Sequence, residues 1–175
     1  PLAEVRALLA SQNLPTDYID VPYTPFLVVA GARKILIDTG LGEFGGPTTG
    51  KLLDSLRAAG MQASDIDTVL ISHFHGDHIS GLRNKAGEWT FPKAKVMVPA
   101  AEHAFWMDDA RMAAAPAGMK GAFENARRTF ATMPADTLVR FEAGNEVAPG
   151  IQSVAAYGHT PGHPLVELKS AGQNF

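Results

Sequence analysis

Short runs of apolar and β-branched residues, separated by turn residues, recur along most of the chain. The runs at 26–30 and 34–38, joined by Gly31-Ala32-Arg33, predict a β-hairpin. The same pattern predicts further strands at 66–72, 95–98, 138–141, 151–157 and 165–168. The strands outnumber the helices early in the chain, which favours an α/β fold with a substantial antiparallel part.

Apolar residues at helical spacing predict helices at 2–11, from about 49 to Gly60, at 100–108 and at 118–132. The last of these has an apolar face of Met119, Phe123, Ala126 and Phe130. A loop is expected around 113–116, and three prolines between 15 and 25 keep the chain extended after the first helix. We see no internal repeat and no interdomain linker, so residues 1–175 are expected to form a single domain.

One hexapeptide, His73-Phe74-His75-Gly76-Asp77-His78, concentrates three imidazoles and a carboxylate directly after a predicted buried strand. Neutral imidazole and carboxylate are ordinary ligands of zinc and similar divalent ions. The alternative to a metal site is a solvated polar loop without a ligand. In an extended loop alternate side chains face the same way. We therefore expect His73, His75 and Asp77 on one side, with a turn at Gly76 bringing His78 round to join them.

Other candidates lie elsewhere in the chain. His159 follows a predicted strand in a loop rich in Gly and Pro, and we expect it to be a further metal ligand. His163, four residues later, is expected to support the ligands or the loop rather than to bind metal directly. His103 is expected to be structural or to line a pocket. Asp38 ends a strand, where it is either a turn cap or a carboxylate that orients a ligand histidine.

Composition narrows the choice of function. The chain has 175 residues, 46% hydrophobic and 19% charged, and its net charge of −3 comes without a basic stripe. Nucleic acid and anionic membranes are therefore not expected as partners. The absence of cysteine excludes disulfides and thiolate ligands. No stretch predicts a membrane span or a signal peptide, so we expect a soluble protein, and the sequence does not distinguish cytoplasm from periplasm.

Three ordered motifs resemble those of the metallo-β-lactamase superfamily. The hexapeptide matches the signature H-x-H-x-D-H, Ile37-Asp38-Thr39-Gly40 matches the first motif, and the stretch GHTPGH at 158–163 matches the third. Residues around Phe44, Trp106 and Phe123 are most similar to the branch of methyl parathion hydrolase and the lactonases. This resemblance implies an αβ/βα sandwich whose two metal ions lie at the sheet edge.

The resemblance also implies roles for individual residues. His73, His75 and His159 would hold one ion, while Asp77 and His78 would hold the second. Zinc is the expected metal, although the same ligands suit iron, cobalt and manganese. Asp77 would also act in catalysis by orienting a metal-bound hydroxide. An aromatic wall of Phe44, Trp106 and Phe123 would contact an apolar part of the substrate, and ordinary core packing is the alternative for each of them.

The sequence departs from the family pattern at both ends. A bridging aspartate and a last histidine, expected after the GHTPGH motif, are absent, and so is the hairpin expected before Pro1. We therefore expect a front part of the fold, with one ion bound firmly and the second weakly. The leading prediction is a metal-dependent hydrolase of small esters, lactones or organophosphate triesters.

Three other functions are alternatives to a metal-dependent hydrolase. The first is an inactive fragment that associates with itself or with a partner, which the missing ligands favour. The second is a redox di-iron protein, for which the hexapeptide offers few carboxylates. The third is a nuclease, which the negative charge of the chain disfavours.

Overall fold

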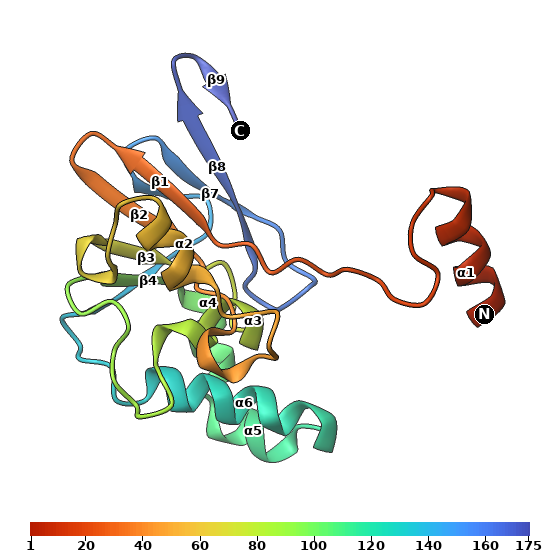
Figure 1. The fold of residues 1–175 in the computed structure, drawn as a ribbon. Coiled ribbons are helices and arrows are strands. Elements are labelled where there is room, and N and C mark those ends of the chain that lie inside the picture. Colours follow the sequence, from red (N-terminus) through yellow and green to blue (C-terminus); the bar gives the residue numbers. More distant parts are fainter.

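The computed structural model describes residues 1–175 and contains two β-sheets that lie against each other (Figure 1). The first has five strands in the order β1-β2-β3-β4-β5. Their bounds are Phe26–Ala30, Arg33–Ile37, Thr68–Leu70, Lys95–Pro99 and Leu138–Phe141. Strand β1 pairs antiparallel with β2 in the predicted hairpin, and β2 to β5 are parallel. The first sheet is therefore mainly parallel, and the antiparallel part that the sequence predicted lies in this hairpin and in the second sheet.

The second sheet is antiparallel throughout, in the order β6-β7-β8-β9. Its strands are Glu146–Ala148, Ile151–Ala155, Pro164–Ser170 and Gln173–Asn174. The sequence predicted β7 and β8 but missed β6 and β9, which are only three and two residues long. Strands this short carry too few alternating positions to give a readable pattern.

Six α-helices accompany the sheets, with bounds at Leu2–Ser11 (α1), Leu52–Ala58 (α2), Gly76–Ile79 (α3), Ala100–Trp106 (α4), Asp109–Ala114 (α5) and Ala117–Phe130 (α6). The loop predicted at 113–116 is wrong in its first half, because α5 extends to Ala114. Asp108 begins this helix by accepting a hydrogen bond from the backbone N–H of Arg111 at 2.9 Å. The helix ends just before Pro116, since the residue preceding a proline is kept out of helical geometry.

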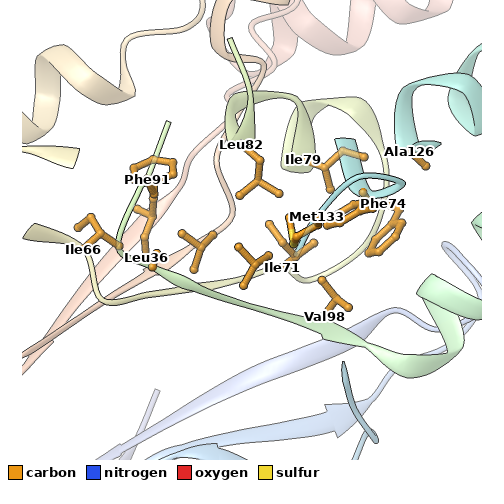
Figure 2. Close-up of a cluster of buried hydrophobic side chains, with 14 of the residues drawn as sticks. Leu36, Ile66, Ile71, Phe74, Ile79, Leu82, Phe91, Val98, Ala126 and Met133 are labelled. Atoms are coloured by element: carbon orange, nitrogen blue, oxygen red, sulfur yellow. The ribbon is translucent and has the colours of Figure 1, made fainter. Parts of the chain in front are cut away.

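Two apolar clusters hold the layers together. The larger lies between the first sheet and the helices and includes Leu36, Val96 and Val98 together with Phe123 and Phe130 of α6 (Figure 2). The smaller lies between the two sheets and includes Ile35, Ile37 and Ile151. Residues 35, 36 and 37 alternate between these clusters, as side chains of one strand must. Strand β3 is buried along its whole length, as expected for a central parallel strand. The predicted α/β class is confirmed.

The first helix has a different environment. Helix α1 is present as predicted but buries no residue, and Leu2 and Leu8 are each 65% exposed. Figure 1 shows it apart from the sheets, at the end of the extended segment that the prolines predicted. No helix of the chain is both long enough and apolar enough to cross a membrane. Helix α1 therefore contributes nothing to positioning the residues that the sequence singled out.

Candidate metal centre

The hexapeptide begins where β3 leads out of the first sheet, and its one aromatic residue anchors it. Phe74 is fully buried in the apolar cluster (Figure 2). Its ring stacks on that of Phe130 of α6, with ring centroids 4.2 Å apart. Because alternate residues of an extended segment point to opposite sides, the flanking His73 and His75 project together, away from Phe74. The sequence predicted this part of the arrangement.

The second half of the hexapeptide is helical, so the predicted extended geometry is wrong beyond His75. Helix α3 starts at Gly76, and the backbone N–H groups of His78 and Ile79 both bond to the carbonyl oxygen of His75. Asp77 and His78 therefore lie on one helical turn and form a pair of their own. The distance between Asp77 Oδ2 and His78 Nε2 is 3.2 Å.

Three imidazole nitrogens from the two predicted loops converge. His159 Nε2 lies 3.1 Å from His73 Nε2 and 3.0 Å from His75 Nδ1. The three side chains can present their nitrogens within 4.8 Å of one another. His73 is buried, with 2% of its surface exposed, whereas His159 is exposed. The long-range convergence of residues 73, 75 and 159 is the central feature of the site.

This cluster suits a divalent ion better than it suits hydrogen bonding. Zinc binds imidazole nitrogen at about 2.0–2.1 Å in tetrahedral geometry, which separates neighbouring nitrogens by about 3.3 Å. Burial, reinforced by the neighbouring imidazoles, lowers the pKa of His73 to about 2. Burial and His159 also lower the pKa of His75. Both rings are therefore neutral at pH 7, which is the form that binds a metal.

Asp38 is the carboxylate that organises the other side of the centre. Its Oδ1 accepts a hydrogen bond from the backbone N–H of Ser72, and its Oδ2 lies 2.8 Å from both Ser72 Oγ and His78 Nδ1. Ser72 Oγ is also 3.0 Å from His73 Nδ1. These contacts leave His73 Nε2 facing His159 Nε2 and leave His78 Nε2 facing Asp77. The sequence identified Asp38 but missed Ser72, because a serine at a strand end gives no distinctive signal.

The backbone at Asp38 is left-handed, with φ of 60°. Aspartate and asparagine tolerate this conformation better than most residues do. Burial by itself lowers the pKa of His78, but the hydrogen bond and charge of Asp38, together with Asp77, raise the pKa above its ordinary value. Asp38 thus fixes both the orientation and the charge of His78.

Two other histidines occupy different positions. The ring of His163 lies 4.8 Å from that of His73, and its buried Nδ1 has no hydrogen-bond partner. It is not part of the converging group of three. His103, on α4, lines a separate hollow with Met107 and Phe130, where burial and Arg140 lower its pKa. The structure keeps His103 out of the centre, in the structural or pocket-lining place that the sequence predicted.

A hollow of about 250 Å³ opens beside His75 and His159. Apolar side chains make up much of its wall: Phe105, Trp106, Met119 and Pro161. The sequence predicted Trp106 here but missed Phe105 and Met119, which it could not distinguish from core residues. A larger hollow, of about 520 Å³, lies away from the histidines, between residues 20–25 and 39–55.

The other two predicted pocket aromatics lie elsewhere. Phe123 is buried behind Trp106, 4.7 Å between ring centroids, and belongs to the core, so its predicted place on the wall is wrong. It lies on the buried stripe of α6, which packs against α4. Phe44 is 39% exposed and does not line the hollow, and the guanidinium of Arg128 lies over its ring at 4.0 Å.

Glu102, a fully buried carboxylate on α4, was not predicted as a site residue. Its Oε2 accepts hydrogen bonds from the backbone N–H of Phe74 at 3.0 Å and from Trp106 Nε1 at 2.9 Å. Its Oε1 accepts one from the backbone N–H of Gly162 at 2.7 Å. An acidic residue in the first turn of a helix is common enough to pass unnoticed.

Comparison with known proteins supports a relationship at the level of the family. The family model of the metallo-beta-lactamase superfamily matches residues 19–175. The dizinc quorum-quenching lactonase AidC, solved with the product N-hexanoyl-L-homoserine, is 28% identical, and the match covers 99% of this chain and 61% of that one with a TM-score of 0.83. The hydrolase AbOPH of the beta-lactamase superfamily is 30% identical, with coverage of 99% and 61% and a TM-score of 0.84.

A similar protein found by its sequence covers a comparable part of the chain. An N-acyl homoserine lactonase of a Bacillus species is 24% identical over 179 residues, covering 90% of this chain and 63% of the relative. The chain thus spans about three fifths of the length of these relatives. The family model, the sandwich of sheets and the histidines at its edge agree, and the chain belongs to the metallo-beta-lactamase superfamily.

Proposed function

We propose that this chain carries the metal-binding part of a hydrolase that opens small lactones, with other small esters as related substrates. The observation that carries the proposal is the convergence of His73, His75 and His159 beside an apolar hollow. The lactonases among the similar proteins support the choice of substrate. Organophosphate triesters remain a predicted alternative, since they offer a comparable polar centre with an apolar leaving group.

Each residue has a proposed part in the binding of metal. His73, His75 and His159 would hold one ion through the nitrogens that already face one another. Asp77 and His78 would supply ligands for a second ion. Zinc is the expected metal, because its affinity for imidazole and carboxylate suits this donor set. When bound, such ions polarise a carbonyl oxygen and lower the pKa of water to about 7.

The residues of the chain itself would then position substrate and protons. Phe105, Trp106 and Met119 would receive the apolar chain of a lactone, which orients its carbonyl toward the histidines. Asp77 Oδ2, beside His78 Nε2, would take a proton from water and return it to the leaving oxygen. Asp38 would hold His78 in place through Nδ1 during these steps.

The test measures zinc content and hydrolysis together on the 175-residue chain. N-hexanoyl homoserine lactone, an aryl ester and a phosphotriester are offered to zinc-loaded protein, and chelated protein serves as the control. The proposal expects lactone opening that requires zinc. Zinc-loaded protein that turns over none of the three substrates would contradict it.

Self-association is a second candidate, favoured by one surface. Val154 of β7 and Leu165 of β8 form a cross-strand pair on the face of the second sheet opposite buried Ile151, and both are exposed. Contiguous apolar patches on a protein surface commonly mark an interface, and this pair would be part of such a patch. Sedimentation of the chain with and without chelator would test this reading, and a monomer at all concentrations would exclude it.

A further inference from the structure

We infer that Glu102 is a positioning residue that sets the separation of the two loops carrying the histidines. The inference rests on the proposed metal site and concerns how that site is assembled. Glu102 lies on α4, outside both loops, and nothing in its sequence context marks it. Its carboxylate is nevertheless in direct contact with each of them.

The two carboxylate oxygens divide the loops between them. Oε2 accepts the N–H of Phe74, the residue between His73 and His75. Oε1 accepts the N–H of Gly162, three residues after His159. Apart from the contacts between the imidazole nitrogens themselves, no hydrogen bond connects 73–78 directly with 158–163. The carboxylate of Glu102 is therefore the only hydrogen-bonded bridge between the backbones of the two loops.

The charge of Glu102 is balanced by these donors alone. The side chain is 0% exposed, and no salt bridge in the chain includes it. Trp106 Nε1 supplies the third hydrogen bond. A buried carboxylate without a cation is costly unless its hydrogen bonds are complete, so the three N–H groups are held close to it. The same requirement keeps the two loops at a fixed distance.

The packing at Gly162 also holds the second loop close to α4. A Cβ atom at this position would lie 2.5 Å from the backbone nitrogen of Glu102 and 2.8 Å from Ala101 Cβ. The loop thus lies directly against the start of α4, and only glycine permits this approach. The close approach is what brings the N–H of Gly162 to 2.7 Å from Oε1.

Replacing Glu102 by glutamine separates this bridging role from mere filling of space. An amide of the same size accepts hydrogen bonds at one end only. In either orientation its NH₂ group faces the N–H of Gly162 or the N–H groups of Phe74 and Trp106. One loop therefore loses its hydrogen bond and is pushed away, and the histidine nitrogens no longer converge.

The experiment compares E102Q with the unchanged chain, with zinc affinity as the first readout. Loss of a residue that orients metal ligands costs about 10- to 100-fold in affinity, and we expect a loss in this range. We also expect an altered visible spectrum when cobalt replaces zinc, since this spectrum reports ligand geometry. A variant that was merely less stable would keep the cobalt spectrum of its folded fraction.

D67N is the matched control. Asp67 accepts the N–H of Lys34 and lies just before β3, at the opposite end of that strand from the hexapeptide. The same change from acid to amide there should leave the zinc affinity and the cobalt spectrum unaltered. E102D, which keeps the charge but shortens the reach, should lose less affinity than E102Q.

A second readout needs no metal. In chelated protein the amide protons of Phe74 and Gly162 should be protected from hydrogen exchange, and in E102Q at least one of them should exchange tenfold faster or more. If the unchanged chain binds no zinc, the proposed function fails while this readout still tests the bridge. Folded E102Q with unchanged zinc affinity and exchange would overturn the inference. Failure of both E102Q and E102D to fold would also overturn it, because Glu102 would then be required by the whole fold.

Discussion

The two loops that bring the histidines together differ in how firmly the fold holds them. Ser72 and His78, at the two ends of the first, bond to Asp38, and the carbonyl oxygen of His78 accepts hydrogen bonds from both Thr39 N and Thr39 Oγ1. Phe74 anchors its middle in the core. Apart from the contacts of His159 with His73 and His75, the loop at 158–163 makes one hydrogen bond to the rest of the fold, from Gly162 N–H to Glu102, besides backbone bonds near its own ends.

The second loop also contains groups that the fold leaves unpaired. Thr160 Oγ1 and His163 Nδ1 are buried without partners. Hydrogen-bonded, well-packed segments resist local opening, whereas sparsely bonded ones open at low cost. The first loop is therefore the rigid half of the site, whereas the second is held by Glu102 and by whatever the histidines bind.

The largest effects are expected from removing single histidines, one from each loop. H73A and H159A should each lower zinc affinity at least 100-fold, more than the loss of a supporting residue would. Their stabilities should differ. H159A removes an exposed ring and should change the free energy of unfolding of chelated protein by less than about 0.5 kcal/mol, whereas H73A should cost about 1–3 kcal/mol.

Zinc titration and chemical denaturation of chelated protein measure the two effects separately. H103A is the control, since His103 is half-buried on α4 but lines a different hollow, and its zinc affinity should not change. Equal destabilisation by H73A and H159A would show that the fold holds the two loops equally firmly.

The next effect concerns the carboxylate that organises the first loop. D38N keeps a residue that tolerates the left-handed backbone but removes the charge facing Ser72 and His78. We expect the second zinc to bind about 10- to 100-fold more weakly, with a smaller effect on the first. The pKa of His78, followed by NMR, should fall, because Asp38 is a main cause of its rise. An unchanged pKa would show that Asp38 does not control this ring.

Acid should weaken the metal-free chain. The folded pKa values of His73, His75 and His103 are lowered, so below about pH 6.5 the unfolded chain binds protons that the folded chain does not. For His73 alone the loss is about 1.4 kcal/mol at pH 5.5. His78 acts in the opposite sense, since its raised pKa adds stability at low pH that disappears as the pH rises through that pKa.

Three lowered pKa values against one raised value predict a net loss of stability on acidification from pH 7.5 to 5.5. Urea denaturation of chelated protein at these two pH values measures it. In H73A the loss should be smaller by about the contribution of His73. A chain that gained stability on acidification would show that these rings are not held neutral.

The smallest effect tests the unpaired hydroxyl of the second loop. Replacing a buried, unpartnered hydroxyl by a methyl group of the same shape removes a desolvation cost of about 1–3 kcal/mol. T160V should therefore raise the free energy of unfolding by about 1 kcal/mol. Thermal denaturation of chelated protein checks this, with T129V as the control. Thr129 Oγ1 bonds to the carbonyl oxygen of Asn125, so its replacement should destabilise. Destabilisation by T160V would reveal a partner for its hydroxyl.

Local patterns predicted the elements with clear periodicity. The hairpin, the later strands and α6 follow from apolar spacing, and the structure has them close to the expected residues, whereas the parallel pairing of β2 to β5 was not predicted. The predicted strand at 66–72 shortens to Thr68–Leu70, because Asp67 bonds across to Lys34 and the chain turns toward the hexapeptide after Ile71. The predicted helix start near 49 moves to Leu52.

The candidate site could be predicted only in part from such patterns. His73, His75 and His159 were predictable because each sits in a motif just after a strand, and the structure brings their nitrogens together. Glu102 was not, since its role depends on which way one turn of α4 faces. The resemblance placed Phe123 on the pocket wall, whereas its position on the apolar face of the predicted helix favoured the core, where the structure has it.

The lowered pKa values of His73 and His75 affect the heat that is measured when zinc binds. His73 and His75 already present unprotonated nitrogens at neutral pH, so a cation entering among them displaces few hydrogen ions. Deprotonation of these two rings should therefore add little to the heat of zinc binding near pH 7.5, and any dependence of that heat on the ionisation enthalpy of the buffer would report protons lost from His78 or from metal-bound water.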